Sequence, residues 1–147
     1  MLTKLSLLAL FGIAMAHFEG VVVVYLRKVL GILDSESNKE SVDKFPQRYL
    51  YIEMTREAAT IIMLVVIAYL VGVTWIEKGV FFLWTFAFWD LFYYLSLYIL
   101  IKWPQKLTTI DVLFLIPKPW IAPVWFPISV SSMTIIIIAI LAMMGIF

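Results

Sequence analysis

One stretch decides the fold class: residues 80–101 read VFFLWTFAFWDLFYYLSLYILI, an apolar run with Asp90 as its single charged residue. A helix of about 20 residues crosses the hydrocarbon of a bilayer, so this run is long enough to span a membrane. Three further apolar stretches qualify, at 5–30, 49–75 and 128–146. Because an open strand leaves its backbone groups unsatisfied in lipid, the sequence predicts a helix for each of the four stretches.

The composition supports a membrane protein. Hydrophobic residues make up 64% of the 147 residues and charged residues 14%, whereas soluble domains carry about 25% charged residues. The net charge of +1 gives no support for nucleic-acid binding. The absence of cysteine excludes disulfides and thiolate metal sites. We therefore expect an all-α membrane protein with one transmembrane domain, residues 1–147, built as a four-helix transmembrane bundle within the lipid bilayer.

The connector before the last helix, residues 108–127, is rich in proline and tryptophan. Four prolines fall within eleven residues, at Pro117, Pro119, Pro123 and Pro127. They exclude a regular helix there, while Trp120 and Trp125 suit the headgroup level of a membrane. We expect a short interfacial helix followed by an extended segment, with a shallow re-entrant loop as the alternative. The segment is either a stiff amphipathic connector or one wall of a cleft for a lipid, quinone or cofactor.

Small residues recur at four-residue spacing in the first apolar stretch, at Gly12, Ala16 and Gly20. Such a face lets another helix approach closely. His17 and Glu19 lie on opposite sides of this face, because each residue advances a helix by about 100°, so they do not form a chelating pair by themselves. We expect helix packing at the small residues, against either a helix of the same chain or a second protomer.

The distribution of lysine and arginine predicts the orientation in the membrane. The connecting loops 31–48 and 102–127, counted with the adjoining helix ends, hold eight of these residues, whereas the opposite side holds Lys4 and Lys78. Cytoplasmic loops carry an excess of basic residues. We therefore expect both loops in the cytoplasm and both termini outside.

Ionisable side chains lie at depths where a membrane helix rarely carries them. His17, Glu19, Glu57 and Asp90 fall well inside apolar stretches, and an ionised side chain at the bilayer centre costs at least about 2.5–3.5 kcal/mol. Carboxylates outnumber the nearby cations, so internal pairing cannot cancel all of them. They must be protonated, bind a cation, or meet water or a partner.

The second apolar stretch carries a polar stripe. Glu53, Arg56, Glu57 and Thr60 follow one another at helical spacings that place them on one face. Arg56 can pair with Glu53, three residues earlier, whereas Glu57 lies deeper and has no obvious counterpart. The stripe is either a structural ion-pair network or a functional site for a cation, a proton or a ligand.

Asp90 is followed by Tyr93 and Tyr94, whose hydroxyl groups can donate to its carboxylate. Along the predicted helices, the ionisable residues descend from mid-membrane toward the cytoplasmic side, where Asp111 follows. Their convergence would form a polar pocket or a proton path open to the cytoplasmic half. Its predicted members are His17, Glu19, Glu53, Arg56, Glu57, Asp90, Tyr93, Tyr94 and Asp111.

Three chemistries fit such a pocket. His17, Glu57 and Asp90 are the predicted ligands for a single iron, manganese or zinc ion, because one imidazole with carboxylates suits these metals. Acids at stepped depths suit a proton relay. A haem with two histidine ligands would need the second histidine from a partner chain, because this chain holds only one.

The last apolar stretch, residues 128–146, carries no charged side chain. Hydroxyl side chains near its start are expected to cap the helix: Ser129, Ser131, Ser132 and Thr134. The rest of this stretch is expected to face lipid.

Several segments together resemble a group of short, uncharacterised prokaryotic four-helix integral membrane proteins. The resemblance lies in residues 17–19 (HFE), 25–27 (YLR), 56–60 (REAAT), 89–94 (WDLFYY) and 111–117 (DVLFLIP). It implies a membrane architecture and a prokaryotic inner membrane as the location. It implies no activity, because none is established for that group.

The sequence predicts a small integral membrane subunit of a larger, energy-related assembly, with its polar pocket holding a partner, a cofactor or a proton path. Other membrane subunits or further copies of the chain are the expected partners. Two alternatives remain open: a metal-dependent membrane enzyme, and a proton-coupled or cation transporter. Whether the chain is an enzyme stays undecided at this level.

Overall fold

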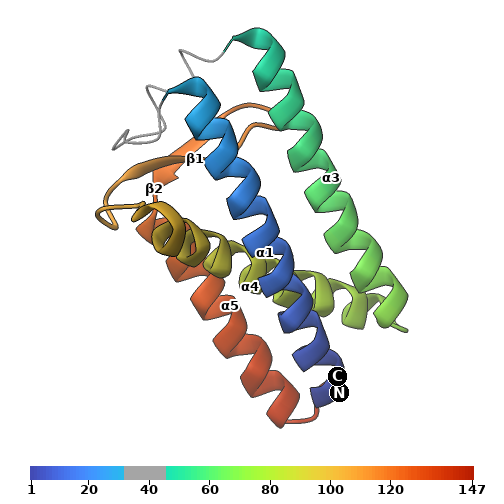
Figure 1. Cartoon of the computed structure of the whole chain (residues 1–147). Helices are drawn as coiled ribbons and strands as arrows, with labels where there is room; N and C mark the ends of the chain where they lie inside the picture. Colours follow the sequence, from blue (N-terminus) through green and yellow to red (C-terminus); the bar gives the residue numbers. More distant parts are fainter. Residues whose placement is uncertain (32–45) are drawn as a thin grey trace.

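The computed structural model describes residues 1–31 and 46–147, and four long helices and one β-hairpin make up this part of the chain (Figure 1). The elements are α1 (Leu2–Leu30), α3 (Gln47–Val71), α4 (Trp75–Ile101), β1 (Ile110–Phe114), β2 (Trp120–Pro123) and α5 (Trp125–Met143). Each of these helices is long and apolar enough to cross a membrane. The four predicted stretches are thus confirmed as helices, with boundaries within five residues of those expected. Most of the predicted loop 31–48 lies outside the described residues.

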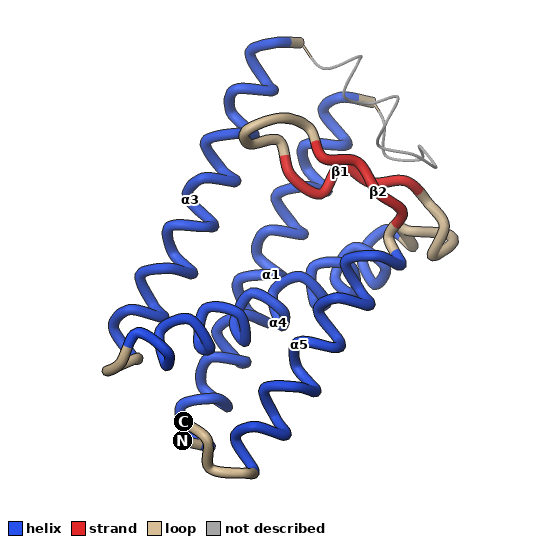
Figure 2. The backbone as a smooth tube through the Cα atoms, turned by 180° about the vertical axis from the view of Figure 1, so that it is seen from behind, coloured by secondary structure: helices blue, strands red, loops and turns tan. Residues whose placement is uncertain are grey.

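Both chain termini lie at one end of the molecule (Figure 1). The hairpin lies toward the other end, near the last turns of α1 and the first turns of α3 (Figure 2). This arrangement agrees with the expected placement of both termini on the same side. Which side of the membrane they occupy stays a prediction from the lysine and arginine counts.

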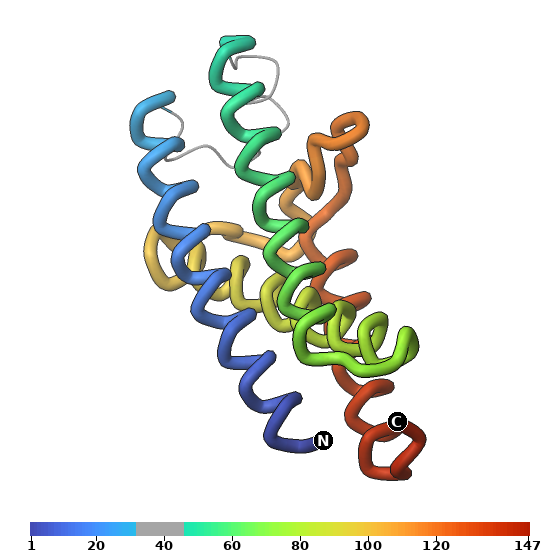
Figure 3. Tube along the Cα trace, turned by 90° about the vertical axis from the view of Figure 1, so that its right-hand side faces the viewer, coloured from blue at the N-terminus to red at the C-terminus, as the bar shows by residue number. Residues whose placement is uncertain are grey.

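α4 is the central helix, because it packs against α1, α3 and α5. Figures 1 and 3 show it crossing the other three helices obliquely. Its buried apolar side chains include Phe81 and Leu97, which have no exposed surface. The stretch that decided the fold class therefore also forms the core of the molecule.

α4 begins five residues earlier than expected because a capping box starts it at Trp75. The Thr74 hydroxyl accepts a hydrogen bond from the backbone N–H of Glu77 at 3.1 Å. The Glu77 carboxylate in turn accepts from the backbone N–H groups of Thr74 and Val73. These bonds satisfy donors that the first helical turn would otherwise leave free.

α5 also begins earlier than expected, and the predicted capping role of its hydroxyl side chains is wrong. Pro127 lies within the first turn, where proline is tolerated because its missing N–H has no helical partner there. The hydroxyl groups of Ser129 and Thr134 therefore lie inside the helix and donate to the carbonyl groups of Trp125 and Val130, four residues earlier.

The small-residue face of α1 packs against α4 of the same chain. A Cβ atom added to Gly12 would lie 2.8 Å from the carbonyl oxygen of Thr85, and one added to Gly20 would lie 3.1 Å from Cβ of Ser96. Ala16, between them, is fully buried. The predicted packing role of these residues is confirmed, and the partner helix lies within the chain.

A bulkier residue at Gly12 should therefore weaken the packing of α1 on α4. We expect Gly12→Val to lower the free energy of unfolding by about 1–3 kcal/mol, the usual cost of overpacking. Unfolding in mixed micelles by increasing amounts of sodium dodecyl sulfate measures the change. Gly79→Val is the control, because nothing lies within 4 Å of a Cβ atom at Gly79. Equal losses in the two variants would contradict the role of Gly12.

The interfacial helix expected at the start of residues 108–127 is absent from the described structure. Residues 110–114 form β1, which pairs antiparallel with β2 in a two-stranded sheet. Pairs such as Val112 with Ile121 fix the register. Apolar and β-branched residues favour strands, and Pro117 and Pro119 fall in the connection, where no ladder hydrogen bond is needed.

Candidate functional site

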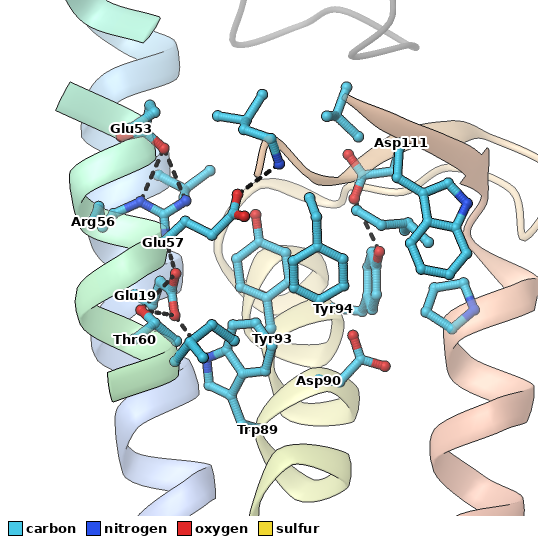
Figure 4. Close-up of a pocket in the computed structure, with 18 of the residues that line it drawn as sticks. Glu19, Glu53, Arg56, Glu57, Thr60, Trp89, Asp90, Tyr93, Tyr94 and Asp111 are labelled. Atoms are coloured by element: carbon cyan, nitrogen blue, oxygen red, sulfur yellow. Dashed lines mark hydrogen bonds and ion pairs between the residues drawn. The ribbon is translucent and has the colours of Figure 1, made fainter. Parts of the chain in front are cut away.

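A cavity of about 280 Å³ lies between the helices and the hairpin (Figure 4). Its wall combines aromatic side chains with charged ones. The aromatic residues are Phe86, Trp89, Tyr93, Tyr94, Phe114, Trp120 and Phe126. The charged residues are Glu19, Arg27, Glu53, Arg56, Glu57, Asp90 and Asp111. All the predicted pocket residues except His17 therefore line one cavity.

His17 lies outside this cavity lining. Its side chain is exposed, and its Nδ1 atom lies 3.3 Å from Oγ of Ser96. His17 and Glu19 are about 200° apart on the helix, so only Glu19 faces the cavity. The structure does not bring His17 together with Glu57 and Asp90, and the described residues contain no group of three or more His, Cys, Asp or Glu residues placed to hold a metal ion.

Glu19 of α1 is the centre of a buried polar cluster. Its carboxylate forms an ion pair with Arg56 of α3 and accepts hydrogen bonds from Nε1 of Trp89 at 2.6 Å and from the hydroxyl of Thr60 at 3.4 Å. Arg56 also binds Glu53, with Nη2 at 2.8 Å. The predicted pair of Arg56 and Glu53 is confirmed, and Arg56 is shared with Glu19.

Glu57 of α3 holds the hairpin against the helices. Its two carboxylate oxygens accept hydrogen bonds from the backbone N–H groups of Leu115, at 2.7 Å, and Ile116, at 3.1 Å. These residues directly follow β1. The counterpart of Glu57 is thus a backbone segment that lies more than fifty residues further along the chain.

Asp90 has a partner other than those expected, and one of the two expected tyrosines binds Asp111 instead. The hydroxyl of Ser131 on α5 donates to Asp90 at 2.7 Å, whereas the hydroxyl of Tyr94 donates to Asp111 at 2.9 Å. The prediction that Tyr94 donates to Asp90 is wrong. The reason is that β1 brings Asp111 to the hydroxyl of Tyr94, while α5 brings Ser131 to Asp90.

Arg27 is the cavity residue that the sequence reasoning missed. In the sequence it is one of the basic residues at the edge of the loop 31–48, yet it is 3% exposed and lines the cavity. Its guanidinium carbon lies 4.0 Å from the centroid of the Trp103 ring. The spacing held the signal, because Arg27 follows Gly20 by seven residues and so continues the buried face of α1.

Comparisons with protein-family models, with curated proteins and with solved structures found no match to this chain. The cavity is therefore the feature of the molecule that bears on its function. Its aromatic wall suits an apolar molecule, and its charged groups suit a polar end. Small-molecule sites combine these two features, with a few polar groups that fix orientation.

Proposed function

We propose that the chain is a small integral membrane subunit whose cavity binds an amphiphilic small molecule, with an apolar body and one polar end. One observation carries the proposal: aromatic side chains and several buried charged groups line the same cavity. Charged side chains at membrane depth are costly and typically mark a binding site or a pathway.

The hairpin supports this proposal because it supplies one wall of the cavity. Val112, Phe114 and Trp120 belong to the lining. Of the two roles open for residues 108–127, the wall of a cleft therefore fits better than a simple connector. Glu57 keeps this wall in place through its bonds to Leu115 and Ile116.

The volume limits what the cavity accepts. Small-molecule sites have volumes of about 300–1,000 Å³, and this cavity, at about 280 Å³, lies at the lower end. It suits a headgroup with the first part of a chain, with the remainder extending along the helices. In the orientation that the lysine and arginine counts predict, the cavity lies in the cytoplasmic half of the membrane.

A proton or cation path is the second candidate function, favoured by the presence of Asp90 and Asp111 in the lining of one cavity. It has less support, because Glu19 and Glu57 are engaged by Arg56 and by backbone N–H groups. A metal-dependent enzyme using His17 is not proposed, because His17 lies apart from the cavity-lining acids.

A side chain that fills the cavity should block binding. Val130 lines the cavity and Val66 does not, yet the two are similarly exposed, at 49% and 48%. We expect bromododecanol or bromododecanoic acid to form a one-to-one adduct with the purified protein in native mass spectrometry. Val130→Phe should weaken that adduct about tenfold, the equivalent of 1.4 kcal/mol of steric cost.

Val66→Phe is the matched control and should leave the adduct unchanged. An absence of adducts with both probes would reject the proposed amphiphile site. Equal adducts in the parent protein and the Val130→Phe variant would place any bound amphiphile outside this cavity and would also count against the proposal.

A further inference from the structure

Hydrogen-bond donors without an acceptor gather where Arg27, a residue of the cavity wall, packs on Trp103. Within residues 1–31 and 46–147, neither Nη1 nor Nη2 of Arg27 has a hydrogen-bond partner, and neither does Nε1 of Trp103. The two side chains are stacked, with 4.0 Å between the guanidinium carbon and the ring centroid. Each residue is 3% exposed, so bulk solvent does not supply the missing acceptors.

The stacking alone does not satisfy Arg27. A cation over an aromatic face gains electrostatic attraction, but a guanidinium carries five N–H donors that the ring does not saturate. Leaving buried charged donors without acceptors costs more than the average hydrogen bond contributes. This point of the wall therefore favours an acceptor from outside the described chain.

The carboxylates of the cavity are engaged by other donors. Arg56 binds Glu19 and Glu53. The other acids and their donors are Glu57 with the N–H groups of Leu115 and Ile116, Asp90 with Ser131, and Asp111 with Tyr94. The acidic residues thus have donors in the structure, whereas Arg27 has donors that lack acceptors.

Building on the proposed amphiphile site, we propose that the polar end of the ligand is an anion, a carboxylate or a phosphate, that binds to Arg27. The two terminal nitrogens of a guanidinium form a fork that matches two oxygens of such a group. The apolar body of the ligand would then lie along the aromatic wall of the cavity, to which Tyr94 belongs. Tyr94 also stacks against Trp103, the ring under Arg27.

Three probes in native mass spectrometry test this inference at neutral pH: bromododecanoic acid, bromododecanol and bromododecylamine. They share one chain and differ in the charge of the polar end. We expect the acid to bind about ten- to a hundredfold more tightly than the alcohol, the range for a charge-assisted hydrogen-bonded pair. Inorganic phosphate is added in competition to separate a free anion from an amphiphile.

Three variants test the role of Arg27: two carry a substitution at Arg27 itself, and one carries a substitution at the neighbouring residue. Arg27→Gln should bring the affinity of the acid down to that of the alcohol, and Arg27→Lys should keep part of the preference, because an ammonium keeps the charge without the fork. Lys28→Gln is the matched control, since Lys28 is the exposed next residue and loses the same charge. It should leave the preference unchanged.

The outcomes separate this inference from the proposed function. Equal binding of acid and alcohol to the parent protein, or tighter binding of the amine, would overturn the anion site and leave the amphiphile site standing. No adduct with any probe would overturn both. Inorganic phosphate that binds as tightly as the acid would support the anion site and overturn the proposal that the ligand is an amphiphile. The comparison of probes uses the parent protein, so it holds even where Arg27→Gln fails to fold.

Discussion

Arg56→Gln should lower the free energy of unfolding by about 3–5 kcal/mol, the cost of breaking a buried ion pair by removing one partner. Arg56 is the cation shared by Glu19 and Glu53, which are only 5% and 8% exposed. Its loss leaves two buried carboxylates without that cation. Unfolding by sodium dodecyl sulfate in mixed micelles measures the difference.

The control for this substitution is Arg48→Gln. Arg48 lies in the same helix but is exposed, and surface charges contribute little to stability. The double variant Glu19→Gln with Arg56→Gln should recover part of the loss, because one of the two orphaned carboxylates is then neutral. A loss in Arg56→Gln no larger than in Arg48→Gln would contradict the ion-pair cluster.

Glu57→Gln should release the hairpin from α3. The carboxylate accepts two backbone hydrogen bonds, from Leu115 and Ile116, and bonds to a charged group contribute about 1.5–3 kcal/mol each. A neutral amide keeps one oxygen acceptor and turns a donor toward the second N–H. We expect the amides of these two residues to exchange their hydrogens about tenfold faster or more, corresponding to a loss of at least 1.4 kcal/mol. Hydrogen exchange measured by mass spectrometry detects this change.

Glu77→Gln provides a matched comparison for the hairpin variant. Glu77 also accepts hydrogen bonds from two backbone N–H groups, those of Val73 and Thr74, but it does so at the start of α4. Its replacement should speed exchange there and leave residues 115 and 116 unchanged. If Glu57→Gln left exchange at those two residues at the parent rate, Glu57 would not be the group that anchors the hairpin.

Local patterns predicted the features that depend on neighbours along one helix. The length and apolar character of residues 80–101 predicted a helix that is long enough to cross a membrane. The pair of Glu53 and Arg56 follows from a spacing of three residues, which fixes their positions on one face. The shared face of Gly12, Ala16 and Gly20 follows from their spacing of four residues. That spacing did not reveal which helix packs against this face.

The sequence did not predict contacts between side chains from distant segments. Glu19 meets Thr60 and Trp89, which lie 41 and 70 residues away, and no periodicity along one helix reports that distance. The same holds for Asp90 with Ser131 and for Tyr94 with Asp111, where the expected pairing was wrong. The hairpin was missed because prolines mark where a helix cannot form but do not reveal which strands pair.

The surplus of buried acids suggested that the groups without a counterpart would be carboxylates, among them Glu57. The composition determined that these charges need partners, because burial in an apolar medium is costly wherever the helices lie. Only the tertiary structure decided which group keeps unsatisfied donors, because the crossing of α4 and the position of the hairpin supply partners to the acids. Within residues 1–31 and 46–147, Arg27 of the cavity wall, stacked on Trp103, keeps both terminal nitrogens without a hydrogen-bond partner.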